Sequence, residues 1–473
     1  MNRRDFLKTS SRGTAAFTLG GFLARAYGSA QAIGPMAASA LTDTDRILIL
    51  IRLDGGNDGL NTLVNFEDDA YYQARSDLNI SKSDALPLTD TQGLHPELTG
   101  FKALYDEGHM MAVQGVGYPN PNRSHFRSTD IWMTASDANE YLTHGWLGRY
   151  LETQVTGDPE TLPEHPVAVD IGPVLSLALL GKNGAMGIAL KDPRQFFYLV
   201  DQGNKILDGQ KLPTPAGFEL DFVRQVNFES LQYSKQVQDA AETGENTAEY
   251  PDSTLADQLA LIARLIDGGL KSRVYLVSQR GYDTHSNQLS RHGTLMKDLN
   301  GAVSAFQNDL KQLGHQDRVL GLTVSEFGRR VKENGSAGTD HGTAAPLFLF
   351  GTSLIGGIHG PVPRFNALDD RGDFHHDFDF RQVYASVLHQ WFNVPGDIVQ
   401  LVFPGSPGLL PLVRVTADLD AVDFNEDGKL DFGDFIAFAR EFGGQNPRFD
   451  LDGDGTVGFS DFISFAQAFG KRG

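Results

Sequence analysis

Acidic and histidine side chains gather in three short clusters between residues 281 and 343. Two of the clusters directly follow the apolar runs Val274–Val277 and Val319–Val324, which are typical of buried parallel strands. Ligands bind outside the carboxyl ends of the strands in open α/β sheets, and Asp, Glu and His are ligands for divalent ions. The clusters therefore predict a metal site at a sheet edge. Its candidate ligands are Asp283, His285, Glu326, Asp340 and His341.

Another apolar run, Arg46–Leu53, ends in the acidic, glycine-rich turn Asp54–Gly59. This pattern predicts a central strand that brings carboxylates to the sheet edge, where glycines let the backbone approach a ligand. The alternative is a tight turn that uses Asp and Asn for its own hydrogen bonds, but the three clusters favour a metal site. Asp54 and its rival Asp58 therefore join the candidate metal ligands.

A turn rich in Pro and Asn precedes Ser124, where we expect a helix to begin. A serine at this position is either a helix cap or, beside a metal, a nucleophile. The neighbouring Arg123, His125 and Arg127 are typical of a site that binds phosphate or sulfate. Ser124, His125 and Arg123 are therefore the candidate catalytic residues.

The overall charge and the absence of cysteine exclude several functions. The chain of 473 residues has a formal net charge of -20, which argues against nucleic acid as a partner because a phosphate backbone attracts basic surfaces. It contains no cysteine, so disulfides, thiolate metal sites and a cysteine nucleophile are excluded.

The first 32 residues have the pattern of a twin-arginine signal peptide. Arg3 and Arg4 precede a mildly apolar stretch over residues 14–23, and residues 30–32 offer a small-x-small cleavage site. The alternative is a chance arginine pair before an amphipathic helix. We expect a linker over residues 33–45 and export by the twin-arginine pathway to the periplasm, the medium or the cell surface. No later stretch has the 18 to 20 apolar residues that a membrane-spanning helix needs.

Residues 417–473 contain an internal repeat with the spacing of a calcium-binding loop followed by a Phe-rich helix. Each loop places oxygen ligands at positions 1, 3 and 5, glycine at position 6 and Asp at position 12. The predicted calcium residues are Asp423, Asn425, Asp427, Lys429, Asp431, Asp434, Asp450, Asp452, Asp454, Thr456 and Asp461. The doublet resembles dockerin modules, which have Asp at position 12. This resemblance implies a small all-α EF-hand module with a cohesin-like protein partner, and a tail stiffened by calcium is the alternative.

Several dispersed motifs, in this order, resemble the domain-of-unknown-function 1501 family, which is similar to the alkaline phosphatase and sulfatase superfamily. They lie at Asp54–Asn61, Asn122–Phe126, Gly281–His285, Ser325–Arg329 and Gly338–Gly342. The resemblance implies an alkaline-phosphatase-like α/β domain over residues 46–412, with a central, mostly parallel sheet flanked by helices. It also implies one or two divalent ions (Zn²⁺, Mg²⁺ or Ca²⁺) on the acids and histidines, with Ser124 attacking phosphorus or sulfur.

The sequence departs from the superfamily pattern at two places, which bear on the expected nucleophile and on the expected metal ligands. Ser124 is not followed by the x-Pro-x-Arg sequence of formylglycine sulfatases, so that chemistry is disfavoured. His359 and His375 are both poor matches for the late third histidine ligand of the superfamily.

Two functional hypotheses follow from the sequence. The first is an exported, metal-dependent hydrolase of phosphate or sulfate esters, with small-molecule or polysaccharide-linked substrates. The second is a non-catalytic metal-binding or scaffold protein that is anchored to a partner through the calcium module.

Overall fold

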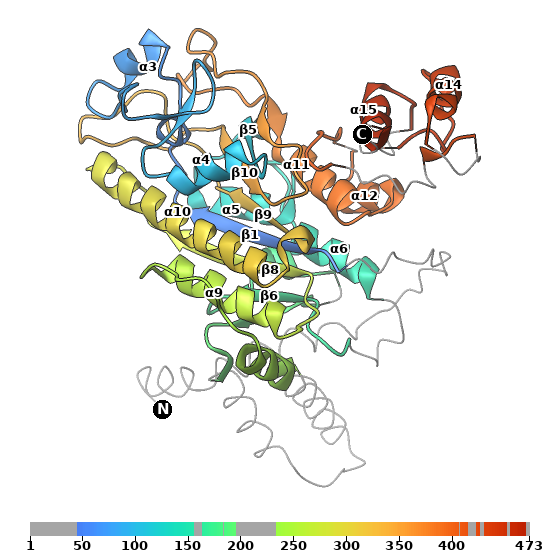
Figure 1. The fold of residues 1–473 in the computed structure, drawn as a ribbon. Coiled ribbons are helices and arrows are strands. Elements are labelled where there is room, and N and C mark those ends of the chain that lie inside the picture. The colour runs from blue at the N-terminus through green and yellow to red at the C-terminus, as the bar shows by residue number, and fades with distance from the viewer. Residues whose placement is uncertain are drawn as a thin grey trace. The chain divides into compact units, whose positions relative to one another are not determined.

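The computed structural model describes residues 45–155, 163–182, 184–194, 233–405, 407–414, 422–425, 430–451 and 455–469 (Figure 1). The predicted signal peptide and nearly all of the predicted linker lie outside these residues. The chain divides into two compact units. The first contains residues 1–52, 141–279 and 301–316, and the second contains residues 53–140, 280–300 and 317–473.

The first unit contains four neighbouring strands in the order β1-β8-β6-β7. They are β1 (Ile47–Asp54), β6 (Ala168–Ile171), β7 (Ile188–Leu190) and β8 (Val274–Arg280), the last residues of β1 and β8 belonging to the second unit. Strand β6 pairs in parallel with both β7 and β8. Almost every residue of β1 is buried, as a strand covered on both faces requires.

Helices of the first unit include α6 (Trp146–Gln154) and α9 (Thr254–Asp267). The sequence of α9 is amphipathic, as expected for a helix with one buried face. Helix α9 begins after Ser253, whose side chain accepts a hydrogen bond from the Ala256 amide. Its apolar face is buried, and Figure 1 shows the helix running beside β6 and β8.

The second unit contains the strand order β11-β5-β10-β9, with β12 also pairing with β5. These strands are β5 (Met110–Gly117), β9 (Val319–Val324), β10 (Ala345–Phe350), β11 (Gly357–His359) and β12 (Phe378–Asp379). Strands β11 and β12 run parallel to β5, whereas β10 runs antiparallel to both β5 and β9. The predicted α/β fold with a central sheet and flanking helices is therefore confirmed, and β10 is an antiparallel exception within it.

The second unit also contains helices and a small sheet. The sheet has the order β2-β4-β3, and helix α4 packs through Phe101, whose ring meets Phe348 and Phe350 of β10 at centroid distances of 5.8 and 6.4 Å. The bounds of the elements are α2 (Gly59–Thr62), β2 (Leu63–Val64), α3 (Asp69–Ala74), β3 (Leu86–Pro87), β4 (Gly93–Leu94), α4 (Thr99–Asp106), α5 (His125–Thr134), α11 (Phe380–Ser386) and α12 (Gly396–Val402). Helix α10 (Gln288–Gln312) begins in this unit and ends in the first.

The C-terminal repeat forms two helices, α14 (Phe432–Glu441) and α15 (Phe459–Phe469). Their buried core takes residues from both repeats: Val422, Phe424, Leu430, Phe438, Phe449, Val457 and Phe465. Asp434 and Asp461, at position 12 of the two loops, are both fully buried. The predicted calcium residues Asp427, Lys429, Asp452 and Asp454 lie outside the described residues.

Within the described residues, no helix has both the length and the apolar character needed to cross a membrane.

A buried histidine makes the stability of the second unit depend on pH. His292 in α10 is 1% exposed, and its Nε2 lies 3.1 Å from Asn57 Oδ1. Burial lowers the pKa of His292 from 6.5 to about 4, although the Asp58 carboxylate opposes the shift. The unfolded chain therefore binds a proton between pH 6.5 and 4 that the folded chain does not bind.

We predict that His292→Gln flattens the pH dependence of stability in this window. The free energy of unfolding of the native protein should fall as the pH is lowered from 6.5 to 4, at up to about 1.4 kcal/mol per pH unit from this group. Urea unfolding at several pH values measures the difference between native and variant protein. Equal slopes for the two proteins would contradict the assignment.

Candidate metal centre

Asp283 is the centre of a cluster of three histidines and one arginine in the second unit. It follows β8, and its Oδ1 lies 3.0 Å from His285 Nε2, 3.1 Å from His341 Nε2 and 2.8 Å from Arg329 Nη2. Its Oδ2 faces His125 Nε2 at 3.6 Å. The structure therefore brings together Asp283, His285 and His341, as the sequence predicts, and adds His125.

Each imidazole of the cluster is held by an acceptor at its Nδ1. His285 Nδ1 lies 3.1 Å from Asp340 Oδ1, His341 Nδ1 lies 2.8 Å from the Arg123 carbonyl oxygen, and His125 Nδ1 lies 2.9 Å from Glu326 Oε1. Because carboxylate and carbonyl oxygens only accept hydrogen bonds, Nδ1 is the donor in each case. In the neutral imidazoles, all three Nε2 atoms therefore carry lone pairs that are available to a metal.

These lone pairs face other acceptors, which is unfavourable without a cation. The Nε2 atoms of His285 and His341 are 3.0 Å apart. Burial lowers the pKa of His341, although hydrogen bonds to the Arg123 carbonyl and Asp283 oppose the shift. Burial raises the pKa of Asp283, but hydrogen bonds from Arg329 and from the protonated form of His341 outweigh it and lower the pKa to about 2. A shared proton or a divalent ion relieves the resulting repulsion.

Glu326 has a second feature that fits a bound cation. Its Oε1 accepts hydrogen bonds from the Gly55 amide at 2.8 Å and from His125. Its Oε2 is buried and, among the described residues, has no hydrogen-bond partner. An orphaned carboxylate oxygen beside a histidine cluster points to a cationic partner. His125, Asp283 and His341 have ligand atoms that all lie within 4.8 Å of one another, and His285 Nε2 lies 3.0 Å from Asp283 Oδ1. Imidazoles with fixed tautomers and a carboxylate are typical ligands of Zn²⁺.

The loops that carry the ligands approach one another very closely. Gly55 has a φ of +123°, and a Cβ atom there would overlap the backbone nitrogen of Asp283. A Cβ on Gly338 would overlap the backbone of His285. Glycine is required at both positions because a side chain would push the ligand loops apart.

Two other predicted ligands lie outside the cluster. The carboxylate of Asp58 is 1% exposed, pairs with Arg75 Nη1 and Nη2 at 2.7 and 3.0 Å, and also accepts a hydrogen bond from Gln288. It belongs to a buried ion pair, and we correct its assignment from metal ligand to structural anchor. Asp54 lies at the end of β1, 3.9 Å from Arg280, and is not part of the His125–Asp283–His341 group.

The predicted catalytic residues have three different environments. Ser124 is exposed at the N-cap position of α5, and its side chain makes no cap hydrogen bond within the described part of the chain. Arg123 directs its guanidinium to Asp373 at 2.5 Å and Asp369 at 3.3 Å. His125 Nε2 faces Asp283 Oδ2 at 3.6 Å, so His125 is a candidate metal ligand as well as a neighbour of Ser124.

The sequence pattern placed His125 among the residues for oxyanion binding, and the structure adds it to the candidate metal ligands. Its partners Glu326 and Asp283 lie far along the chain, so no local spacing indicates them. The local signal was one histidine next to a predicted helix start, and that pattern is common in proteins without metals.

A cavity of about 290 Å³ lies beside the cluster. Its wall contains three arginines, two of the histidines and two carboxylates: Arg123, Arg330, Arg371, His285, His341, Asp340 and Asp373. Arginine forks match the oxygens of phosphate and sulfate, so the cavity offers a place for an oxyanion next to the metal ligands.

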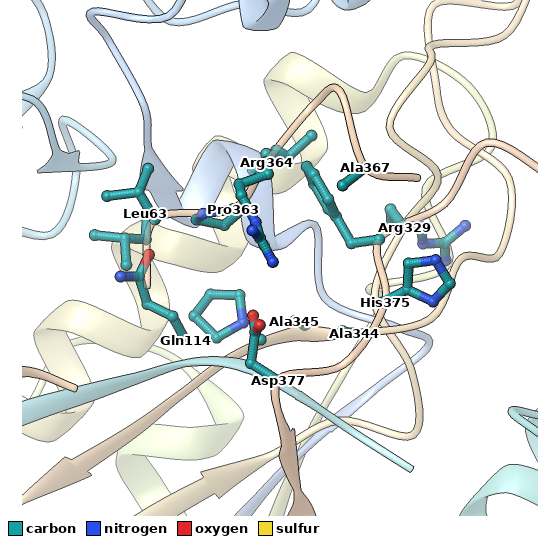
Figure 2. Close-up of a pocket in the computed structure, with 16 residues that line it drawn as sticks. Leu63, Gln114, Arg329, Ala344, Ala345, Pro363, Arg364, Ala367, His375 and Asp377 are labelled. Atoms are coloured by element: carbon teal, nitrogen blue, oxygen red, sulfur yellow. The ribbon is translucent and has the colours of Figure 1, made fainter. Parts of the chain in front are cut away.

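A second hollow of about 90 Å³ lies in this unit, and Arg329 is one of the residues that line it (Figure 2). Figure 2 shows Arg364 and Asp377 directed into it, with His375 at one side and Leu63 and Gln114 at the other. His375 therefore lines a different pocket from the one beside the cluster, and the ring of His359 packs on Phe378 at a centroid distance of 5.0 Å. Neither is in the His125–Asp283–His341 group.

We predict that Asp340→Ala lowers the affinity for zinc by about 10- to 100-fold, because Asp340 fixes the tautomer and orientation of His285. Competition with a chromophoric chelator measures this affinity. The control is Asp370→Ala, which removes an exposed carboxylate nearby and should leave the affinity unchanged. Equal affinities for Asp340→Ala and the native protein would contradict the role of Asp340.

Three comparisons place the chain among known proteins. Among solved structures, the zinc complex of the C-terminal periplasmic domain of EcEptC from Escherichia coli shares 10% identity with a TM-score of 0.34 and covers 68% of this chain and 77% of that chain. A protein of the alkaline phosphatase superfamily from Vibrio parahaemolyticus has 10% identity, a TM-score of 0.31 and coverages of 68% and 63%. The phosphonate monoester hydrolase SpPMH from Silicibacter pomeroyi has 8% identity, a TM-score of 0.32 and coverages of 77% and 77%.

All three TM-scores are below 0.5. No curated protein matches the sequence. A family model described as "Protein of unknown function (DUF1501)" matches residues 45–400. The match covers most of the chain and confirms the resemblance seen in the dispersed motifs, and the chain therefore belongs to this family.

Proposed function

We propose that the protein is a metal-dependent hydrolase of phosphate or sulfate esters. The observation that carries the proposal is the convergence of three imidazole Nε2 atoms on Asp283, each imidazole being held at Nδ1 by a separate acceptor. His125, Asp283, His285 and His341 would hold the ion. When bound, a divalent ion supplies Lewis-acid stabilisation of negative charge on the ester oxygens.

The residues around the cluster support a hydrolytic role. The cavity with Arg123, Arg330 and Arg371 on its wall would orient the oxyanion of the ester. Ser124 is exposed, makes no cap bond among the described residues and directly precedes His125, so its hydroxyl is free to act as the nucleophile. Its Oγ would bond to phosphorus or sulfur as the alcohol leaves, and water would then hydrolyse the seryl ester.

We predict that the native protein binds zinc and hydrolyses aryl phosphate or aryl sulfate esters, and that Ser124→Ala abolishes turnover while zinc remains bound. Metal analysis of protein purified without chelators and an ester screen provide the two measurements. Ser290→Ala, at an exposed serine of α10, is the matched control and should retain activity.

The same experiment separates hydrolysis from the scaffold hypothesis. Zinc without turnover in the native protein would favour a non-catalytic metal-binding protein. Turnover that survives Ser124→Ala would remove Ser124 as the nucleophile.

We further propose that the C-terminal repeat binds two Ca²⁺ ions as a dockerin-like module with a cohesin-like partner, and that the protein is exported by the twin-arginine pathway. In both repeats the carboxylate at position 12 accepts hydrogen bonds from two backbone amides of its own loop, which supports the calcium proposal. Asp434 accepts hydrogen bonds from the Asn425 and Asp431 amides, and Asp461 accepts them from the Leu451 and Gly458 amides. The export proposal rests on the sequence of residues 1–32.

We predict that calorimetric titration of the full chain detects two calcium sites beyond any site filled in the main domain. Asp434→Asn and Asp461→Asn should each remove one of them, because position 12 supplies a carboxylate ligand. Asp90→Asn, in an exposed loop, should leave both sites intact. An unchanged stoichiometry in the two loop variants would refute the calcium proposal.

A further inference from the structure

A buried glutamine connects the two loops that carry the metal ligands. Gln288 is the first residue of α10 and is completely buried. Its Oε1 accepts hydrogen bonds from Thr339 Oγ1 at 2.6 Å and from Thr284 Oγ1 at 3.1 Å. Both threonines are also completely buried, so neither hydroxyl can bond to water instead.

Both threonines lie next to residues of the metal cluster in the sequence. Thr284 lies between Asp283 and His285, and Thr339 immediately precedes Asp340. A single carbonyl oxygen therefore fixes both ligand loops at once. The loops are also joined by Arg329, which donates to the Tyr282 and Thr339 carbonyls. The Gln288 oxygen is a second buried contact that both loops share, and the threonines that donate to it lie directly beside the candidate ligands in the sequence.

The backbone of the loops is joined at the same place. The Thr339 amide donates to the Thr284 carbonyl at 3.2 Å, and the Gln288 amide donates to the Ala337 carbonyl at 2.9 Å. These bonds hold the loops in register, while the side chain of Gln288 sets how far each threonine lies from the helix start.

The other end of the glutamine side chain is anchored. Its Nε2 donates to Asp58 Oδ2, and Asp58 is held in turn by Arg75 in a buried ion pair. The Arg75 guanidinium also donates to the carbonyls of Val331 and Arg330. The amide of Gln288 is therefore fixed in one orientation, with its oxygen toward the threonines.

We propose that Gln288 is a positioning residue that sets the spacing of the metal ligands, and that its amide orientation is fixed by Asp58. This inference rests on the proposed metal site, but it concerns a residue outside that site. It also assigns a function to Asp58, whose carboxylate contributes to the metal site through Gln288 and not by direct ligation.

The test is the zinc affinity of Gln288→Leu, measured by chelator competition, together with the visible spectrum of the Co²⁺-loaded protein. Leucine has a similar size but removes the acceptor of the Thr339 hydroxyl and leaves the Thr284 hydroxyl with only the Tyr282 carbonyl, at 3.3 Å. We expect a loss of affinity of about 10- to 100-fold, the range typical of residues that orient ligands, and a changed Co²⁺ spectrum. Thr339→Val, which removes one hydroxyl with little change of shape, should show a smaller loss in the same direction.

Gln390→Leu is the matched control. Gln390 is also a buried glutamine of the second unit, and it bonds the backbone of Leu410, Leu412 and Val413, away from the ligand loops. This variant should lose thermal stability but keep the native zinc affinity and Co²⁺ spectrum. If Gln288→Leu does not fold, Thr339→Val carries the comparison with the control.

The outcomes distinguish this inference from the proposed function. A native protein that binds no zinc would refute the metal site itself. A native protein that binds zinc, with unchanged affinity and spectrum in Gln288→Leu and Thr339→Val, would overturn only the role of Gln288. Equal losses of affinity in Gln390→Leu would also overturn it, since the effect would then follow from stability alone.

Discussion

The buried guanidinium of Arg329 is the interaction on which the metal cluster depends. Its side chain is fully buried and donates to the carbonyls of Gly55, Gly56, Tyr282 and Thr339, and to Asp283 Oδ1. These acceptors come from three segments that are distant in sequence: the turn after β1, the loop after β8 and the loop before β10. A buried charge is tolerated only when its donors are satisfied, so Arg329 stabilises the one arrangement in which all three loops converge.

Two layers of polar contacts result from this convergence. The first layer consists of the acceptors behind the imidazoles, namely Asp340, Glu326 and the Arg123 carbonyl, which fix the histidine tautomers. The second layer consists of Gln288 and the Asp58–Arg75 ion pair, which connect the loops to the start of α10 and to the turn after β1. These contacts hold the candidate ligands in one orientation, which reduces the cost of ordering them when an ion binds.

The sequence predicted the parts of the site that depend on local pattern. The apolar runs Val274–Val277 and Val319–Val324 correspond to β8 and β9. These two strands lie on either side of β1, and the loops that follow them carry Asp283, His285 and His341. Asp58 could not be assigned correctly, since an acidic, glycine-rich turn has the same sequence pattern whether its carboxylate meets a metal or a buried arginine. Arg75 and Gln288, which decide between these roles, lie 17 and 230 residues away along the chain. His125 was missed as a ligand for the same reason, because only tertiary structure brings it to Asp283.

The most direct test of this account is a crystal structure of the zinc-loaded protein with anomalous diffraction data at the zinc edge. The account predicts one strong anomalous peak bound by Asp283 and the Nε2 atoms of His125, His285 and His341, at distances of about 2.0–2.2 Å, with the Nδ1 bonds to Glu326, Asp340 and the Arg123 carbonyl retained. An anomalous peak elsewhere in the chain, or none in crystals soaked with zinc, would contradict it.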